Sequence, residues 1–338
     1  MKSFAYIVNP ITIKQLKDFW PAVKILPDFI LKPAFKNLAP FKIAHIKKIK
    51  SAPGQEISGF LILCPLLEEL SALEEEFIIE KIIYASRIAE KLGVDILGLG
   101  GYMALILDES NKLAKNLKIP LTSGNSYTSW SVFEAIYRLT KARNVALKES
   151  KLAIIGAANP MGSLCARKLA GYVNSIIIFD KQPDELEPLR EAILELNPIE
   201  AIIAEDAQRA VKDADIVINA NSLPGVPFEV KELKPNAVVC DISLSGDILT
   251  QGKARPDVTI IQAGLIRLPD ARNLSISSGL PKGIVPASLA ETMLLTFAGK
   301  FTNYSLLGES VNLDKLEDIA DLAARHGFEV WVPQAPLQ

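Results

Sequence analysis

Histidine and cysteine are scarce in this chain of 338 residues, which contains two histidines and three cysteines. His45 and His326 lie far apart, and Cys64, Cys165 and Cys240 include no CxxC spacing. Neither a metal site made of histidines and thiolates nor a disulfide framework is therefore expected. We predict no bound metal and three buried cysteines with a structural role.

An excess of positive charge is also missing. The chain has 37 Lys and Arg residues against 39 Asp and Glu residues, and its formal net charge is −2 at pH 7. Its basic residues form no block longer than the pair Lys47 and Lys48. Proteins that follow the phosphates of a nucleic acid normally need a basic surface, so no nucleic-acid partner is expected.

Long apolar runs are absent as well, since none reaches the roughly 18 residues that a membrane span needs. The first residues, Met1–Phe4, do not resemble a secretory signal. Nevertheless 49% of the residues are hydrophobic and the mean hydropathy is +0.23, which indicates extensive burial. We expect a cytoplasmic globular protein without a membrane span, and a homo-oligomer is one way to bury that surface.

Before about residue 147 the pattern of strands and helices is only partly clear. An apolar run at 59–64 precedes a 3.6-residue periodicity over 68–92 and a second apolar run at 95–99. A polar turn then precedes a helix expected over 129–143. The first 58 residues contain six prolines and no clean periodicity, so no element is predicted there.

After residue 150 the alternation becomes regular. Apolar runs typical of buried strands lie at 152–156, 175–180, 201–204, 215–220, 236–241 and 258–261. Helical stretches separate the first four of them, and this spacing indicates βαβ crossovers and a parallel sheet. Two further helices are expected at 287–300 and 313–326.

The predicted fold class is α/β. We expect an N-terminal α/β substrate domain over 1–147 and a Rossmann-like doubly wound parallel-sheet nucleotide domain over 148–284. C-terminal helices over 285–338 close the fold, and we expect them to pack back on the N-terminal domain.

A glycine turn over residues 156–162 carries the main chemical signal, with the pattern G-x-x-N-x-x-G. It follows a strand and opens a helix, so its N–H groups and the positive helix end can bind a pyrophosphate. Asn159 stands where a second glycine is common, and asparagine tolerates the left-handed conformation. Asp180 lies 24 positions after Gly156, where an acidic group binds the adenosine ribose, whereas Lys181 beside it favours a 2′-phosphate.

These features predict a site for NAD or NADP, with a plain α/β sheet and an unliganded turn as the alternative. The nicotinamide end is expected at the carboxyl ends of later strands, where Asp241 also lies, although each residue there fits ordinary turn chemistry equally well. The residues predicted to bind the cofactor are Gly156, Ala157, Asn159, Pro160, Met161, Gly162, Asp180, Lys181, Asn219, Asn221, Ser222 and Gly264.

Several short blocks resemble a known family in their order along the chain. Besides the glycine turn they are LGGY at 99–102, TSGNSYT at 122–128, AETMLLTF at 290–297, FTNYS at 301–305 and RHGF at 325–328. From about residue 41 to 328 the chain thus resembles the long-chain acyl-[acyl-carrier-protein] reductases of cyanobacteria. The resemblance implies reduction of fatty acyl thioesters to aldehydes with NADPH, and a small-molecule or acyl-carrier substrate.

One position departs from that family. The reductases transfer the acyl group to a cysteine just before the block at 290–297, and Ser288 stands in its place. A serine hydroxyl needs a general base, and its oxyester accepts hydride less readily than a thioester. Ser288 is therefore a candidate catalytic residue. The favoured interpretation is nevertheless an N-cap of the following helix, with Glu291 completing a capping box, and the catalytic role is the alternative.

The resemblance also implies that the polar turn at 122–128 forms a wall of the substrate cleft, facing the nicotinamide. The alternative is a helix-capping loop, with Thr128 or Ser129 at the cap. The residues expected to contact substrate are Gly100, Gly101, Thr122, Asn125, Tyr127 and Thr128.

Three functions remain open. The first is an NAD(P)-dependent oxidoreductase acting on an acyl thioester or aldehyde. The second is a dehydrogenase of the shikimate or quinate type, although no Lys and Asp pair stands in the expected context. The third is a non-catalytic nucleotide-binding regulatory protein. Aldehyde production, hydroxy-acid oxidation and binding without turnover distinguish the three.

Overall fold

The computed structural model describes residues 1–10, 13–66, 75–100, 103, 117–221, 227–243, 247–270, 280–306 and 312–332. The chain forms two compact units, each built from segments that are far apart in sequence. Unit 1 comprises Met1–Tyr127, Ile266–Ser310 and Asp318–Glu329, and unit 2 comprises Thr128–Leu265, Val311–Glu317 and Val330–Gln338. The domain boundaries expected after residues 147 and 284 stay predictions, because compactness does not show which segments fold independently.

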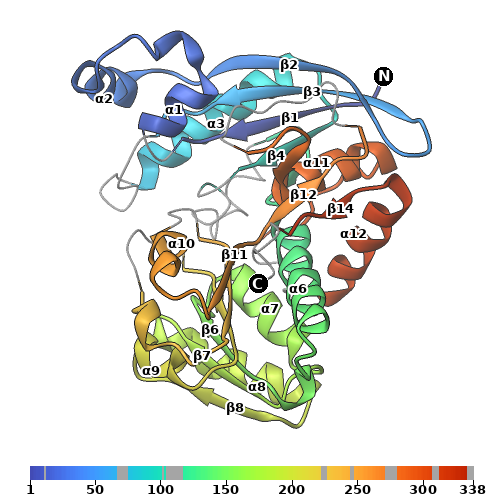
Figure 1. Ribbon diagram of the computed structural model, residues 1–338. Coiled ribbons are helices and arrows are strands. Elements are labelled where there is room, and N and C mark those ends of the chain that lie inside the picture. The colour runs from blue at the N-terminus through green and yellow to red at the C-terminus, as the bar shows by residue number, and fades with distance from the viewer. Residues whose placement is uncertain are drawn as a thin grey trace. The chain divides into compact units, whose positions relative to one another are not determined.

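Unit 2 contains a six-stranded parallel sheet with the order β11-β10-β9-β6-β7-β8 (Figure 1). Its strands are β6 (Lys151–Ile155), β7 (Ser175–Phe179), β8 (Glu200–Ile203), β9 (Ile216–Asn219), β10 (Val238–Asp241) and β11 (Thr259–Gln262). Counted along the chain from β6, this is the strand order of a Rossmann fold. The order reverses between β6 and β9, which is where such sheets bind their ligands.

The helices of unit 2 cover this sheet. Those that follow β6 are α7 (Pro160–Leu169), α8 (Leu186–Leu196), α9 (Ala207–Lys212) and α10 (Asp247–Gln251). The unit also contains the 3-10 turns η4 (Leu147–Glu149), η5 (Pro183–Glu185), η6 (Val230–Glu232) and η7 (Gly252–Ala254). On one face, Ala210 and Val211 of α9 pack against Ala153, Val217 and Val239 of the central strands. All six predicted strands are confirmed, each to within two residues at either end.

Unit 1 contains a five-stranded sheet with the order β2-β3-β1-β4-β5, in which only the β2–β3 pair is antiparallel. The strands are β1 (Ser3–Val8), β2 (Phe41–Lys50), β3 (Glu56–Leu63), β4 (Ile96–Leu99) and β5 (Leu121–Thr122). The central strand β1 lies in the segment for which the sequence predicted no element. Five of its six residues are buried, and a short run buried on both faces shows no alternation.

Two helices cover opposite faces of the β1 strand. Ala5 and Ile7 belong to a buried cluster with Ile78 and Ile82 of α3 (Glu75–Lys91). Tyr6 points to the other face, because successive side chains of a strand alternate, and there it meets α11 (Ala287–Ala298). Helix α11 is apolar and buried along almost its whole length, as expected for a helix inside a core.

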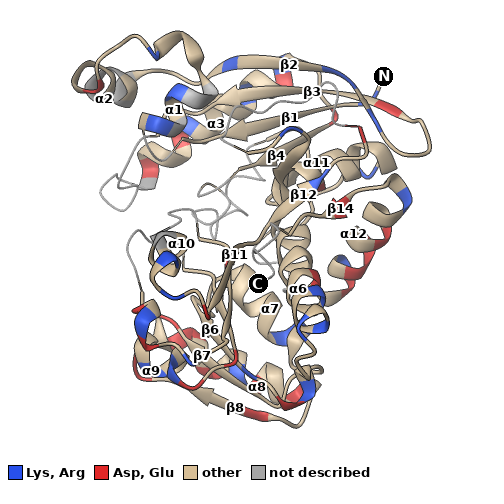
Figure 2. Cartoon of the chain, viewed as in Figure 1, with Lys and Arg blue, Asp and Glu red and all other residues tan. Residues whose placement is uncertain are grey.

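Helix α6 (Asn125–Ala142) begins in unit 1 and continues in unit 2. The remaining elements are α1 (Ile13–Phe19), η1 (Pro21–Val23), α2 (Asp28–Asn37), α12 (Leu313–His326) and a three-stranded sheet of β13 (Ile284–Pro286), β12 (Leu265–Arg267) and β14 (Glu329–Val330). Charged residues of both signs are interspersed along the outer helices (Figure 2). Among the described residues, no helix has the length and apolarity to cross a membrane.

The structure corrects two helix boundaries. The helix expected over 68–92 is observed from Glu75 to Lys91, and residues 67–74 lie outside the described part of the chain. The helix expected from residue 129 begins at Asn125, so the polar turn is shorter than predicted. Gly124 supplies the bend before it, with a φ of +79°. The predicted C-terminal helix at 313–326 is confirmed as α12.

Candidate active site

The glycine turn of residues 156–162 follows β6 and lies at the switch point of the unit 2 sheet. Gly156 has a φ of +80°, and a Cβ there would lie 2.7 Å from the carbonyl carbon and oxygen of Ala220, directly after β9. The N–H groups of Gly156 and Ala157 donate to the Phe179 carbonyl at 2.9 and 3.1 Å. Glycine is thus required here both by the backbone conformation and by the close approach of the neighbouring chain.

Asn159 holds the turn in a way that the sequence did not predict. Its φ is −71° and its ψ 159°, so the expected left-handed conformation is wrong. Instead Asn159 is the N-cap of α7: its Oδ1 accepts the Gly162 N–H at 2.9 Å. Its Nδ2 donates to the Ala220 carbonyl, which ties the turn to the end of β9. Asparagine is suited to this position because its amide both accepts and donates.

The same turn has the features of a phosphate cradle. A Cβ at Gly162 would lie 2.2 Å from the Gly156 carbonyl oxygen, so this glycine lets α7 pack closely on β6. Pro160 opens the helix and has no N–H of its own. Within the described chain, the half-buried Asn159 and Met161 have backbone N–H groups without a protein acceptor. The residues present therefore fit a pyrophosphate at the positive end of α7.

Asp180 lies where the sequence placed it, directly after β7 and beside the glycine turn. Its carboxylate accepts the N–H of Ala158 at 3.0 Å and the N–H of Gln182 at 3.1 Å. These two bonds leave acceptor capacity on both oxygens, since a carboxylate has about four lone-pair sites. Lys181 beside it is exposed.

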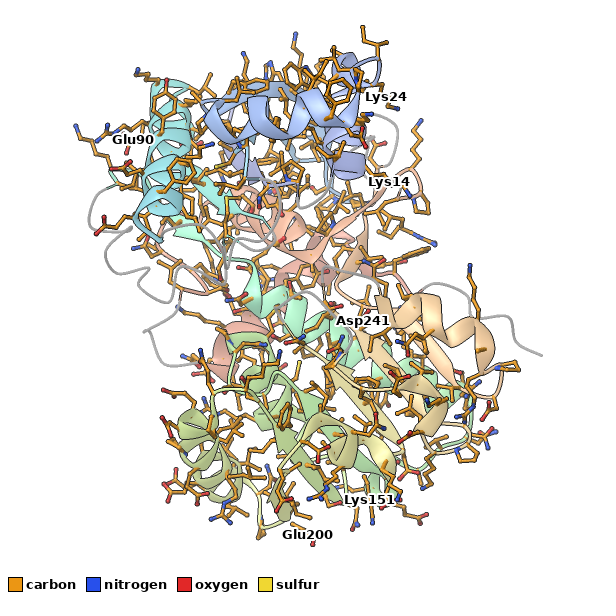
Figure 3. The ribbon with its side chains drawn as sticks, turned by 90° about the vertical axis from the view of Figure 1, so that its left-hand side faces the viewer. Lys14, Lys24, Glu90, Lys151, Glu200 and Asp241 are labelled. Carbon is orange, nitrogen blue, oxygen red and sulfur yellow. The ribbon has the colours of Figure 1, made fainter. Side chains whose placement is uncertain are left out.

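A polar network joins the ends of β9 and β10. Buried Asn219 donates from Nδ2 to Asp241 Oδ1 at 2.8 Å, and the same oxygen accepts the Ser243 N–H at 3.0 Å. The N–H of Asn221 donates to Asn219 Oδ1 at 3.4 Å. In Figure 3, Asp241 stands at the edge of the sheet opposite Lys151, which begins β6. The structure thus brings the predicted Asn219 and Asn221 to the carboxyl edge beside the turn.

Two further residues were predicted to bind the cofactor. Gly264 follows β11 with a φ of +77°, and a Cβ there would make an ordinary contact with the Thr128 methyl group at 3.5 Å. Ser222 lies outside the described residues.

In unit 1, Ser288 is the second residue of α11. The N-cap of this helix is Pro286, and no side chain makes a capping hydrogen bond. The predicted capping box is therefore wrong, because both Glu291 oxygens bond elsewhere. The Ser288 Oγ instead lies 2.7 Å from the Tyr6 hydroxyl oxygen.

Glu291 is a fully buried acid on the same helix, 0% exposed. Thr122 donates its hydroxyl proton to one carboxylate oxygen, and the Tyr127 N–H donates to the other at 2.7 Å. Burial raises the pKa of Glu291, and these hydrogen bonds oppose that rise. The carboxyl thereby fixes the start of α6 against α11.

Two glycines allow these parts to approach closely. A Cβ at Gly124 would lie 2.2 Å from the Ser288 Cβ, and one at Gly100 would lie 2.7 Å from the Tyr6 hydroxyl oxygen. We call Tyr6, Thr122, Ser288 and Glu291 the Ser288 cluster.

Of the predicted substrate residues, Thr122 belongs to this cluster, Gly100 and Tyr127 contact it, and Asn125 begins α6. Thr128 lies within α6, so neither it nor Ser129 caps that helix, and Gly101 is outside the described residues. Sequence reasoning missed Tyr6, because nothing near it in the chain signals a partner 282 positions away.

None of the three cysteines is poised as a nucleophile. All are buried, as predicted, and burial raises the pKa of Cys64 and of Cys165 to about 12 and also raises the pKa of Cys240. A thiolate, which is the nucleophilic form, is therefore disfavoured at each of them. The described residues contain no group of three His, Cys, Asp or Glu side chains that could hold a metal ion.

No protein-family model matches the chain. It is 26% identical over 314 residues to the long-chain acyl-[acyl-carrier-protein] reductase of Synechococcus elongatus, covering 87% of this chain and 89% of that protein. It is also 26% identical over 304 residues to the aminotransferase PigE of a Serratia species. That match covers 88% of this chain and 35% of PigE, so the chain spans about a third of that protein's length.

Solved structures that align with this chain include two dehydrogenases. L-tryptophan dehydrogenase from Nostoc punctiforme is 14% identical with a TM-score of 0.41, covering 95% of this chain and 80% of that one. Quinate dehydrogenase from Corynebacterium glutamicum, in complex with NAD, is 14% identical with a TM-score of 0.38, covering 76% and 86%. The chain is thus an α/β protein with a Rossmann-like parallel sheet and a distant sequence similarity to a reductase.

Proposed function

We propose that this protein is an NAD(P)-dependent oxidoreductase that reduces the carbonyl group of an acyl thioester or aldehyde. The observation that carries the proposal is the glycine turn at the switch point of the unit 2 sheet, where Rossmann folds bind dinucleotides. The sequence similarity to an acyl thioester reductase, which extends through both units, supports the type of reaction.

The cofactor is held by residues of unit 2. The N–H groups of Asn159 and Met161 and the start of α7 bind the pyrophosphate. Asp180 accepts hydrogen bonds from the ribose hydroxyls of NAD, whereas Lys181 pairs with the 2′-phosphate of NADP. The network of Asn219 and Asp241 lies at the strand ends where the nicotinamide is expected. When bound, the reduced nicotinamide supplies a hydride.

The substrate carbonyl is held by residues of unit 1. Ser288, half-buried in the first turn of α11, presents a hydroxyl next to that of Tyr6. The hydrogen bonds of Glu291 with Thr122 and with the Tyr127 N–H hold the start of α6 against α11, close to Ser288. Hydroxyl donors and a helix N-terminus stabilise negative charge that develops on a carbonyl oxygen.

The test is to incubate the purified protein with a fatty acyl thioester of coenzyme A or of acyl-carrier protein, with NADPH and separately with NADH. Aldehyde formation is followed by mass spectrometry. We expect aldehyde with wild type and none with Gly156→Val, which blocks the cofactor site. Nucleotide binding without any turnover would contradict the proposal and favour a regulatory role. Oxidation of shikimate or quinate would favour a hydroxy-acid dehydrogenase instead.

A further inference from the structure

We propose that Ser288 is a hydrogen-bond donor to the substrate carbonyl oxygen, oriented by Tyr6, and that reduction proceeds without an acyl-serine intermediate. This inference rests on the proposed function and adds to it the roles of two residues and the order of bond changes. Ser288 is the catalytic residue in this scheme. Tyr6 is a positioning residue, since it acts through Ser288.

Either hydroxyl of the Tyr6–Ser288 pair can donate, and the surroundings of Tyr6 favour Tyr6 as the donor. Tyr6 is 4% exposed on the central strand β1, and within the described chain its hydroxyl meets one polar partner, the Ser288 Oγ at 2.7 Å. A buried hydroxyl proton needs an acceptor, and a phenol is a stronger acid than an aliphatic alcohol. Tyr6 therefore donates to Ser288, and the proton of Ser288 is left for another acceptor.

Among the described residues, the Ser288 Oγ has one hydrogen-bond partner, the Tyr6 hydroxyl, and no acid or histidine bonds to it. The nearest acid along α11 is Glu291, and its two oxygens accept from Thr122 and from the Tyr127 N–H. His326 stacks on Phe297 near the other end of α11, with ring centroids 5.1 Å apart. Burial raises the pKa of Tyr6 to about 12, so its phenol stays neutral and cannot take the serine proton. A serine without a base is a weak nucleophile.

The position of Ser288 suits a donor. It lies in the first turn of a 12-residue helix, where free N–H groups and the helix dipole favour negative charge. Ser288 is half-buried, whereas Tyr6, its hydrogen-bond partner, is buried. A chain of donors from Tyr6 through Ser288 to a carbonyl oxygen is polarised along its length.

The reaction then balances without covalent catalysis. The thioester carbonyl carbon accepts a hydride, with its electron pair, from reduced nicotinamide, which is oxidised. Negative charge develops on the carbonyl oxygen that accepts the Ser288 hydrogen bond. Re-formation of the carbonyl double bond breaks the C–S bond, and the leaving thiolate takes up one H⁺ from the buffered solvent. The products are aldehyde, thiol and oxidised nicotinamide, and Ser288 keeps its proton throughout.

The first experiment needs no turnover. Wild type and Ser288→Cys are each incubated with palmitoyl-CoA in the absence of nicotinamide cofactor, and their intact masses are measured. We expect an acyl adduct on Ser288→Cys, because a thiol at a helix N-terminus forms a nucleophilic thiolate, and none on wild type. An acyl group on Ser288 of wild type would overturn the inference. No adduct on either protein would count against thioesters as substrates, and hence against the proposed function.

The second experiment uses a double-mutant cycle. Ser288→Ala is expected to lower kcat about 100- to 1,000-fold, as does loss of an oxyanion donor. Tyr6→Phe is expected to lower kcat about 10-fold with KM nearly unchanged, and to have no further effect in the Ser288→Ala background. Ser288→Thr, which keeps the hydroxyl, should recover part of the activity. Equal effects of Tyr6→Phe in both backgrounds would show that Tyr6 does not act through Ser288.

Discussion

The glycine turn of unit 2 and the Ser288 cluster of unit 1 are held together by different kinds of contact. In the turn, Ala158 and Asp180 are 22 positions apart, and a backbone N–H or carbonyl is one partner in its hydrogen bonds. In the cluster, Tyr6 and Ser288 are 282 positions apart, and Thr122 and Glu291 are 169 apart. Both of these bonds join two side chains. A site whose hydrogen bonds use backbone groups close in sequence tolerates side-chain substitutions better than a site made of buried side chains that bond to one another.

This difference predicts that the cluster depends more strongly on single side chains. Glu291→Ala leaves the Thr122 hydroxyl and the Tyr127 N–H buried without their acceptor and opens a cavity in the core beside α11. We expect a loss of about 3–5 kcal/mol in the free energy of unfolding, measured by urea denaturation. Glu80→Ala, at an exposed position on α3, is the control and should change stability by less than about 0.5 kcal/mol. Equal effects would show that Glu291 does not hold the cluster.

In the glycine turn, by contrast, we expect changes of the backbone to have the largest effect on nucleotide binding. Gly156→Val combines a positive φ with a Cβ 2.7 Å from the Ala220 carbonyl, so the chain after β9 must move. We expect nucleotide affinity to fall at least about 100-fold, or roughly 2.7 kcal/mol, measured by calorimetry or NADH fluorescence.

Gly54→Val is the matched control for Gly156→Val. Gly54 has a φ of +86° with nothing within 4 Å of the added Cβ, so it isolates the conformational cost. Gly54→Val should leave nucleotide affinity unchanged. Unaltered nucleotide affinity of Gly156→Val would show that the glycine turn is not part of the cofactor site.

A smaller effect is expected on the choice between NAD and NADP. The Asp180 carboxylate beside the turn accepts hydrogen bonds from ribose hydroxyls and repels a 2′-phosphate. Asp180→Ser should therefore shift the ratio of the two Kd values about 10-fold toward NADP, which corresponds to about 1.4 kcal/mol. Asp184→Ser, four residues further on, is the control for lost negative charge. A ratio that does not move would place the adenosine ribose elsewhere.

Removing the N-cap of α7 should have a smaller effect again on the free energy of unfolding. Asn159→Ala removes the acceptor of the Gly162 N–H, and loss of an N-cap typically costs about 1 kcal/mol. Asp206→Ala removes the equivalent cap of α9, where the Asp206 side chain accepts the Arg209 N–H at 2.8 Å. Both variants should lose similar stability, but only Asn159→Ala should weaken nucleotide binding. Equal binding by the two variants would reduce Asn159 to an ordinary cap.

The same contrast explains what the sequence could predict. The strands of unit 2 are short apolar runs at regular spacing, and those signals are local, so β6 to β11 were predicted to within two residues. The order that makes β6 and β9 neighbours follows from crossover rules, and the glycine turn marks their junction. The conformation of Asn159 was predicted wrongly although its N-cap partner, the Gly162 N–H, is three positions away. Its second partner, the Ala220 carbonyl, could not be predicted because it is 61 positions away.

The cluster could not be predicted in this way. The letters S-x-x-E at 288–291 match a capping box, but α11 begins one residue before Ser288 and Glu291 bonds to Thr122 and Tyr127. Only the folded sheet brings β1, β5 and α11 together. The partner of Ser288, Tyr6, lies on strand β1, whose residues show no periodic pattern.

The smallest expected effect is the pH dependence of the unfolding free energy that is due to Glu291. Burial raises its pKa in the folded state, so in the folded protein the carboxyl keeps its proton to a higher pH than in the unfolded chain. The folded state therefore binds more protons than the unfolded chain does, and this difference contributes to the stability of the fold. The contribution is fully present below the unfolded pKa of about 4.3 and is lost as pH rises through the folded pKa.

Glu291→Gln has no titrating group at this position, so the difference in unfolding free energy, wild type minus variant, should decrease as pH rises through that window. Urea denaturation of both proteins at several pH values above 4 measures it, and Glu80→Gln corrects for the loss of one carboxylate elsewhere. The sign of the slope is decisive, because desolvation and hydrogen bonding act in opposite directions on this group. A difference that increases with pH would mean that the bonds from Thr122 and the Tyr127 N–H favour the carboxylate more than burial disfavours it. The Ser288 cluster would then contain a buried negative charge, which would oppose the charge that develops on the carbonyl oxygen.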